Sequence, residues 1–407
     1  MKGWIMPAVY TSALDWPLAR TCPMSPPPAL GVVRDGPPTR VRLPAGAGAE
    51  QLVWLITRYE EVKAALKDPR LSADETRPGF PLRIPVPADD RPSGFLRMDD
   101  PEHGRLRRMV APEFTVRRVR ALRPRIQELT DRAADALAAG SQPADLVRDF
   151  AAKVSALVIA RLMGIPDEHT AFFLEQTQIL LTDDDPALSL AAHHRIIGFL
   201  DENARAKEQD PGDDLVSRLV RDHVATGELV RADLLAILKL LLIAGHESTA
   251  TQIAVSTLSL LTDDALRAEV LAESGALLPK FVEESMRFWS IIQDGVVRQA
   301  TEDVRIGETL VREGESVMIS LVAANHDATV FRDPERLDIH RDASGHLLWG
   351  HGAHFCLGAS LGRLEVTLAL DSLFTRLPTL RLACEASRLR FRENPVFHCL
   401  AELPVAW

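Results

Sequence analysis

The sequence predicts a mainly helical fold with small β-sheets, of the α+β class. Apolar residues recur at helical spacing through most of the stretch from 102 to 289. Short β-branched runs punctuated by glycine lie near residue 51 and between 296 and 320. A chain of 407 residues is longer than most single domains, so length alone allows two domains or one large helical fold.

Composition argues against nucleic-acid binding and against a membrane span. The balance of 47 basic against 57 acidic side chains gives a net charge of −10, which disfavours general affinity for nucleic acid. The one long apolar stretch, 234–261, contains Lys239, His246 and Glu247, and these are unfavourable in lipid. The first ten residues lack the apolar core of a secretory signal. Four cysteines without disulfide-like spacing indicate a reducing compartment, so we expect a cytoplasmic protein.

The first elements in chain order surround a long loop. Residues 1–48 are rich in proline and have no sustained period, which predicts extended chain packed on the fold. A buried strand is expected at 51–56 and a short helix at 60–66. Prolines and mixed charges at 72–97 predict a long loop, and loops of that length are usually functional or mobile.

A series of helices follows. Helical spacing predicts them at 102–139, 144–163, 168–181, 188–207 and 213–225. The first of them carries eight arginines between 103 and 125 against one acid, Glu113. These arginines are 105, 107, 108, 117, 118, 120, 123 and 125. A solvated surface and a binding face for an anionic partner are both open interpretations of this run.

The longest predicted helix, 231–261, would extend about 45 Å at the usual rise per residue. Its middle is unusual, because Ala244-Gly245-His246-Glu247-Ser248-Thr249 places small and polar residues where a structural helix keeps apolar ones. One interpretation is a hydrated kink capped by the hydroxyls; the other is a groove where a ligand meets the helix. We favour the ligand groove, because the kink leaves Glu247 unexplained.

The last third of the chain leads to one cysteine. A helix at 276–289 places Glu284 and Arg287 on one face, a small sheet follows at 296–320, and residues 331–341 are expected as coil. Residues 349–358, Trp-Gly-His-Gly-Ala-His-Phe-Cys-Leu-Gly, then form a glycine-rich loop suited to a tight turn or a bulky ligand. Because a helix is expected at 359–370, a Cys356 thiolate would lie near its positive end, where it could bind a metal or cofactor.

The segment 349–358 resembles the haem-binding signature of the cytochromes P450, an aromatic-Gly-x-Gly-x-(His or Arg)-x-Cys-x-Gly pattern. Further segments are similar in the right order: residues 100–108 to the haem-contacting helix of bacterial members, 244–249 to their oxygen-activating groove, and Glu284 with Arg287 to their helix pair. The closing residues 403–407 also resemble a common bacterial ending. The likeness runs from about residue 50 to the end, and it implies one cytochrome P450 domain over 1–407, with haem between the long helix and the cysteine loop.

The resemblance implies a role for individual residues. Cys356 would be the axial ligand of the iron of haem b, with O2 as co-substrate. The cofactor-binding set would be His103, Arg107, Arg298, His354, Cys356, Trp349, Gly350 and Gly358. The catalytic set on the other face would be Ala244, Gly245, Glu247, Ser248 and Thr249, in which an acid and an alcohol relay protons. Glu284, Arg287 and Arg341 would be structural.

The resemblance also places substrate contacts at Leu240, Ile243, Ala244, Ile291, Ile292, Val296 and Phe397. These residues are mostly aliphatic, so we expect a largely apolar substrate. Two positions depart from the family pattern: Ser248 stands where threonine is more common, and Trp349 where phenylalanine is usual. A serine keeps the hydroxyl but loses the methyl group that fixes its rotamer, and the indole of Trp349 could change hydrogen bonding near the sulfur.

The implied activity is haem-thiolate monooxygenation with electrons from ferredoxin and ferredoxin reductase, by a monomer. An acidic ferredoxin would dock on the basic face around Arg105, Arg108 and Arg117. The alternatives are a peroxide-driven peroxygenase or an oxidative coupling enzyme on the same fold, and a haem-binding sensor. A zinc site at His351, His354 and Cys356 would lack a clear fourth ligand. A metalloprotease at His246 and Glu247 would need a second histidine at position 250, which is alanine.

Overall fold

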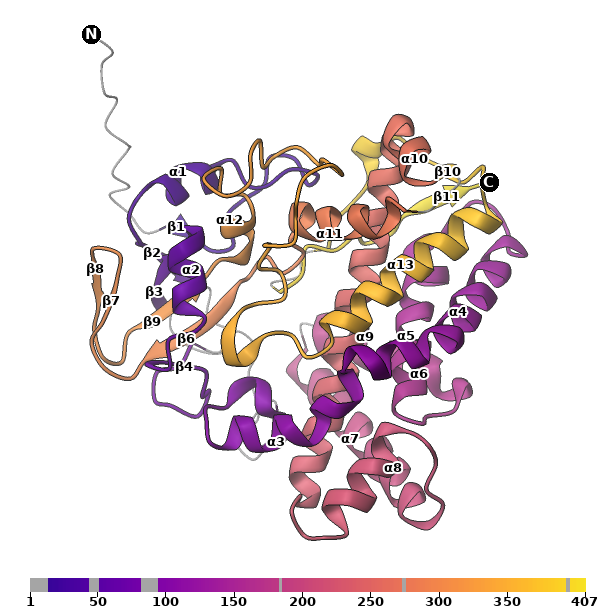
Figure 1. Cartoon of the computed structure of the whole chain (residues 1–407), viewed down its shortest axis with the longest axis horizontal. Coiled ribbons are helices and arrows are strands. Elements are labelled where there is room, and N and C mark those ends of the chain that lie inside the picture. Colours follow the sequence, from indigo (N-terminus) through magenta and orange to yellow (C-terminus); the bar gives the residue numbers. More distant parts are fainter. Residues whose placement is uncertain (1–13, 44–50, 82–93, 183–184, 273–275, 393–395) are drawn as a thin grey trace.

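The computed structural model describes residues 14–43, 51–81, 94–182, 185–272, 276–392 and 396–407. Helices make up most of it and gather on one side, whereas the largest sheet lies on the other (Figure 1). The main helices are α3 (Glu102–Val110), α4 (Val116–Ala138), α5 (Ala152–Leu162), α6 (Thr170–Thr182), α7 (Pro186–Gln209), α8 (Leu215–Leu219), α9 (Arg231–Thr262), α11 (Leu278–Trp289) and α13 (Ala359–Arg376). The predicted class, mainly helical with small sheets, is confirmed.

The largest sheet has six strands in the order β1-β2-β3-β9-β6-β4. Their bounds are β1 (Leu14–Asp15), β2 (Thr39–Leu43), β3 (Gln51–Ile56), β4 (Leu71–Ser72), β6 (Val296–Ala300) and β9 (Ser316–Ile319). A three-stranded sheet joins β5 (Ala144–Asp145), β10 (Arg381–Leu382) and β11 (Pro404–Ala406), and β7 (Val304–Ile306) pairs with β8 (Thr309–Val311). The predicted strands near 51 and within 296–320 are therefore present.

Helix α9 runs through the helical side of the molecule and packs on α5, α11 and α13 (Figure 1). Its C-terminal half is almost continuously buried, from Thr249 to Leu260. By length and composition alone α9 could cross a membrane, but 56% of its most apolar window is buried by protein, as in the core helix of a soluble protein. The buried half therefore holds α9 in place, and the middle of the helix is more exposed.

Some boundaries differ from the predictions for local reasons. The expected helix 102–139 is interrupted after α3, because Pro112 lacks an N–H and Thr115, in extended conformation, caps α4 by accepting a hydrogen bond from the Arg118 N–H. Residues 144–145 form a strand with β11 before α5 begins. Two short helices, α10 (Asp264–Val270) and α12 (Leu321–Asn325), were not predicted. The chain also includes the two-turn α2 (Tyr59–Ala65), which was expected.

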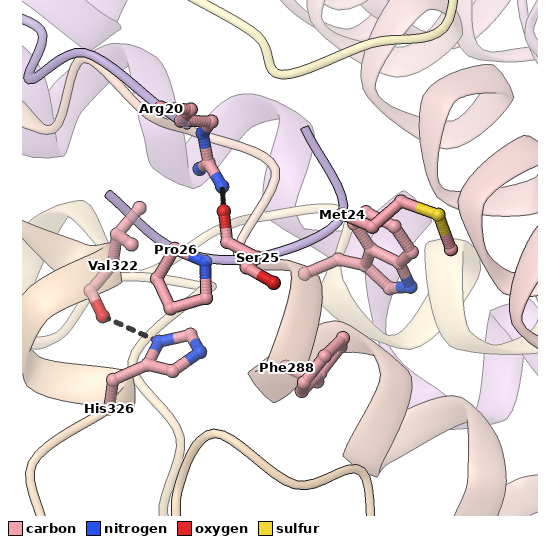
Figure 2. Close-up of a pocket in the computed structure, with 8 residues that line it drawn as sticks. Arg20, Met24, Ser25, Pro26, Phe288, Val322 and His326 are labelled. Atoms are coloured by element: carbon pink, nitrogen blue, oxygen red, sulfur yellow. Dashed lines mark hydrogen bonds between the residues drawn. The ribbon is translucent and has the colours of Figure 1, made fainter. Parts of the chain in front are cut away.

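The amino-terminal segment is not extended throughout, so that prediction is wrong for residues 29–35, which form α1 (Ala29–Asp35). Pro28 precedes this helix and Leu30 and Val33 bury one face of it. The segment does pack on the fold. Figure 2 shows Arg20 hydrogen-bonded to the Ser25 carbonyl (2.6 Å) over a small pocket that Phe288 of α11 and His326 also line.

Candidate active site

Cys356 lies at the end of a tight loop that enters α13. Its backbone N–H donates to the Trp349 carbonyl at 2.7 Å, which closes the loop, and Gly350 and Gly352 take the left-handed conformation with φ of 70° and 77°. Burial raises the pKa of the Cys356 thiol, while the Gly358 N–H and the charges of Arg107 and Arg363 act in the opposite direction. The sulfur is free and partly accessible. It is therefore available as a ligand.

Four predicted cofactor residues meet beside this loop. The rings of His103 and His354 are in contact, with centroids 4.1 Å apart and their planes tilted by 31°. Arg107 of α3 donates to the Phe355 carbonyl at 2.5 Å, directly before Cys356. Burial, and after it the neighbouring charges of Arg298, His103 and Arg107, lowers the pKa of His354 to about 3. Residues from α3, β6 and the cysteine loop thus converge on one place.

Arg298 and His103 are only partly paired within the described residues, although the Nδ1 atom of His103 lies 3.3 Å from Asp100. Arg298 is only 5% exposed, yet among the described residues no carboxylate pairs with it, and its guanidinium donates to the Val297 carbonyl (2.8 Å). Burial, and next to it the charge of Arg97, lowers the pKa of Arg298 to about 10. The Nε2 atom of His103 is buried, and no described residue is its hydrogen-bond partner. Since buried charges and donors need partners, these residues fit a cofactor with two carboxylates, as haem has.

Arg97 is a member of this group that the sequence did not reveal. It ends the short 3-10 helix η1 (Gly94–Arg97), and burial lowers the pKa of its guanidinium. Nevertheless 31% of its side-chain surface is accessible, and its nearest carboxylate, on Glu75, is 4.0 Å away. The Arg97 guanidinium is thus surrounded by protein but not fully covered by it, so it borders an interior space. No local sequence signal marks Arg97, because its neighbour Arg298 is two hundred residues away.

On α9 the predicted distal residues form an uncovered stripe. Ala244 is exposed and Ser248 is partly exposed, although they occupy the middle of a long buried helix. Residues four apart share one helix face. The Ser248 hydroxyl donates to the Ala244 carbonyl (2.7 Å), and the Thr249 hydroxyl donates to the Gly245 carbonyl (3.0 Å). Thr249 itself is buried, so Ser248 is the hydroxyl presented on the accessible side.

The structure corrects the expectation for Gly245. We expected it to admit a ligand, but a Cβ atom there would lie 3.1 Å from the Cδ1 atom of Ile159 on α5. The glycine therefore allows α5 and α9 to pack closely. By contrast, a Cβ atom at Gly358 would meet nothing within 4 Å, so that glycine, next to Cys356, faces open space.

Glu247 points toward the C-terminal segment. Its Oε1 atom accepts a hydrogen bond from Arg392 at 3.3 Å, and its Oε2 atom lies 3.9 Å from the Nε2 atom of His246. Among the described residues Glu247 and Ser248 are not hydrogen-bonded to each other. Sequence reasoning missed Arg392, which no motif marks.

The expected substrate contacts are mostly accessible. Leu240, Ile243, Ile292, Val296 and Phe397 keep part of their surface exposed. Ile292 pairs with Phe397 in an isolated antiparallel bridge. The expectation for Ile291 is wrong: it is 3% exposed and belongs to the core around α9 and α13. Side chains alternate along extended chain, so Ile291 and Ile292 point to opposite faces.

The predicted structural residues form a buried cluster. Arg287 donates to both carboxylate oxygens of Glu284 (2.7 and 2.8 Å), and Arg341 donates to Glu284 Oε1 at 3.2 Å. Arg287 also donates to the carbonyls of Asn325 and Pro334. The cluster thus ties α11 to the coil that leads to Cys356.

Glu283, the preceding residue, makes a second connection that sequence reasoning missed. Its carboxylate bonds to His346 (3.2 Å) in the same coil and to Arg363 of α13. Burial alone would raise its pKa, but His346 and Arg363 together lower it to about 2. Arg363 in turn stacks on Trp349, with 5.0 Å from Cζ to the ring centroid. The Trp349 Nε1 atom is buried and has no hydrogen-bond partner among the residues that the structure describes.

The zinc alternative finds no support in the structure. Within the described ranges, no three histidine, cysteine or acidic side chains cluster in a way that could hold a metal ion. His351, His354 and Cys356 therefore do not converge as ligands. The same holds for His246 and Glu247, which belong to no such group of three within those ranges.

Comparisons with known proteins agree with the haem interpretation. A family model described as Cytochrome P450 matches residues 191–380. Cytochrome P450-SU2 of Streptomyces griseolus is 42% identical over 97% of both chains, and pentalenic acid synthase of Streptomyces avermitilis is 41% identical over 98% of this chain and 99% of its own.

Solved structures give the same result. The mycinamicin VIII C21 methyl hydroxylase of Micromonospora griseorubida, in complex with mycinamicin VIII, superposes with a TM-score of 0.87 at 36% identity, covering 97% of this chain and all (100%) of the other. Similarity at this level over nearly the whole length fixes the family, its enzyme class and its cofactor. The chain belongs to the cytochrome P450 family, as a haem-dependent, O2-using monooxygenase of the bacterial actinomycete type.

Proposed function

We propose that this enzyme inserts one oxygen atom from O2 into a largely apolar small molecule, by hydroxylation or epoxidation, during the formation of a natural product. Names of relatives such as pentalenic acid synthase and mycinamicin VIII hydroxylase support this substrate class. Electrons come from a separate ferredoxin and ferredoxin reductase. The chain acts as a single-domain monomer in the cytoplasm.

The observation that carries the proposal is the uncovered stripe on α9. Ala244 leaves room beside the helix, and Ser248 presents a hydroxyl there. Aliphatic side chains of Leu240 and Ile243 continue along the same helix. A polar group within an apolar wall suits a reaction that needs a proton next to a hydrophobic substrate.

Each residue of the site then has a distinct task. Cys356, the cations Arg97, Arg107 and Arg298, and the imidazoles of His103 and His354 would hold haem, which would supply the activation of O2. Ser248 Oγ gives up its hydrogen bond to the Ala244 carbonyl and donates a proton toward the reacting side. Glu247 takes a proton from solvent and restores that of Ser248. The apolar side chains orient the substrate and exclude water.

Two measurements test this proposal. The reduced, CO-bound difference spectrum should show the band of a thiolate-ligated haem, and Cys356→Ser should abolish it. Ser248→Ala should lower the product formed per electron pair by about tenfold, in line with the loss of one proton donor. Thr262→Ala is the matched control, because Thr262 makes the same type of bond, to the Leu258 carbonyl (2.9 Å), at the far end of α9. Unchanged coupling in Ser248→Ala would refute the relay.

A peroxide-driven peroxygenase or an oxidative coupling enzyme is the second candidate. The acid and alcohol on α9 favour the form that uses O2 and a reductase, because peroxide already carries the electrons and protons that such a relay serves. Turnover with peroxide alone, at a rate no lower than with ferredoxin and reductase, would reverse this order. A complete lack of substrate-induced spectral change would instead favour a haem-binding sensor.

A further inference from the structure

Residues 391–392 and 396–400 of the C-terminal part lie against each other, and Arg392 contacts α9. Phe391 pairs with Leu400 in an antiparallel bridge, and the Arg392 N–H donates to the Cys399 carbonyl at 2.9 Å. The ring of Phe391 stacks on that of His398 with centroids 4.3 Å apart. Arg392 therefore starts from a fixed backbone, and its side chain reaches α9 from a defined direction.

The partner of Arg392 on α9 is Glu247. Arg392 Nη1 donates to Glu247 Oε1 at 3.3 Å across 145 positions of sequence. The carboxylate side chain is only 14% exposed. On its other side lies His246, whose pKa burial lowers, so this histidine is neutral at neutral pH and adds no charge. Arg392 is thus the one cation paired with Glu247 in the part of the chain that the structure describes.

Resting on the proposed role of Glu247 in the proton relay, we propose that Arg392 is a positioning residue for the reaction. It holds the Glu247 carboxylate turned toward the C-terminal segment, where the carboxylate can accept a proton from solvent. The proton gained at Glu247 weakens the ion pair, and the freed carboxyl group turns toward Ser248 Oγ. In this step a proton passes between oxygen atoms, so only O–H bonds form and break and nothing is oxidised or reduced.

This arrangement connects the acid to the substrate side of the molecule. Phe397, which pairs with Ile292, lies two residues before Cys399, whose carbonyl accepts the hydrogen bond from the Arg392 N–H. A substrate that shifts Phe397 would shift the backbone from which Arg392 reaches Glu247. Proton delivery would then be fastest when a fitting substrate is bound.

The test compares Arg392→Gln, Arg392→Lys and the control Arg390→Gln in the haem-loaded enzyme with ferredoxin and reductase. Arg390 lies two residues away, is 79% exposed at its side chain and pairs with Glu402 at 3.5 Å. Arg392→Gln should lower coupling by about threefold, the scale of one partly exposed ion pair, whereas Arg392→Lys and Arg390→Gln should keep it. In a crystal structure of Arg392→Gln the Glu247 carboxylate should have moved.

Further readouts separate a positioning role from a merely structural one. Peroxide-driven turnover should not change in Arg392→Gln, because peroxide bypasses the relay, and a proportional loss there would overturn the inference. Adding Arg392→Gln to Glu247→Gln should have no further effect, since Arg392 acts through Glu247. If Glu247→Gln lowers coupling and Arg392→Gln does not, Arg392 is not the positioning residue. If Glu247→Gln itself leaves coupling intact, the relay is wrong and the inference falls with it.

Discussion

At the scale of single residues, Arg97 and Arg298 carry a direct consequence for cofactor binding. Their charges interact unfavourably with each other, and no described carboxylate pairs with Arg298. The propionates of haem would offset the repulsion between the two guanidinium groups and would give Arg298 a carboxylate partner. We expect Arg97→Gln and Arg298→Gln each to speed the transfer of haem to apomyoglobin by about tenfold, since a charge-assisted hydrogen bond contributes roughly 1.5–3 kcal/mol.

Arg70→Gln is the control for this experiment. Arg70 lies next to β4 and is 45% exposed at its side chain, where it pairs with Asp68 at 2.7 Å. Its loss should leave haem transfer unchanged. If Arg97→Gln transfers haem as slowly as the parent protein and Arg298→Gln transfers it faster, only Arg298 binds a propionate.

At the scale of elements, the loop that carries Cys356 is held by two neighbouring glutamates of α11. Glu284, which is fully buried with Arg287, binds Arg287 and Arg341, whereas Glu283 binds His346 and Arg363. One helix thus fixes both the coil before the loop and the helix after it. The position of the sulfur depends on contacts made far from it.

The Glu283 contacts should make stability depend on acid pH. Because the folded state lowers the pKa of Glu283 from 4.5 to about 2, its contribution is fully present above about pH 4.5 and is lost as pH falls toward 2. About 1 kcal/mol of the free energy of unfolding should be lost between pH 7 and pH 4 through this group. Glu283→Gln should remove that part of the pH dependence in denaturant titrations.

Glu302→Gln is the matched control, because Glu302 is 63% exposed and lies 3.7 Å from Arg70 at the surface. It should leave the pH profile of the free energy of unfolding as in the parent protein. Equal profiles for the parent and Glu283→Gln would show that His346 and Arg363 do not hold the ionised carboxylate.

What the sequence could predict follows the range of the interactions involved. Long helices such as α9 repeat their apolar period many times, so their existence was predictable, and the cysteine loop carries its own motif. The short helices α10 and α12 contain too few turns for the apolar period to repeat clearly, so they were not predicted. Arg97 and Arg392 were missed because their partners, Arg298 and Glu247, are distant in sequence and only the tertiary fold brings them together.

At the scale of the whole molecule, the basic face is smaller than the sequence suggests. Arg105 pairs with Glu102 and Asp233, and Arg118 pairs with Glu113 and Asp213. Of the eight arginines between 103 and 125, those that are exposed and have no ion pair with a described residue are 108, 117, 120 and 123. Arg105 therefore does not belong to the proposed docking surface for ferredoxin, and the remaining four arginines lie on α3 and α4.

On a chain of net charge −10, an acidic ferredoxin would be repelled except where positive charge is concentrated. The double substitution Arg117→Glu and Arg120→Glu should raise the ferredoxin concentration for half-maximal turnover by about tenfold at low salt, and less at high salt, because ions screen the interaction. The CO difference spectrum and peroxide-driven turnover should not change. Arg305→Glu on β7, which Figure 1 places on the far side of the molecule from α4, changes the net charge without touching this face. If Arg305→Glu weakens ferredoxin-supported turnover as much, for each charge changed, as the double substitution does, then the net charge of the protein governs association and the α4 surface does not.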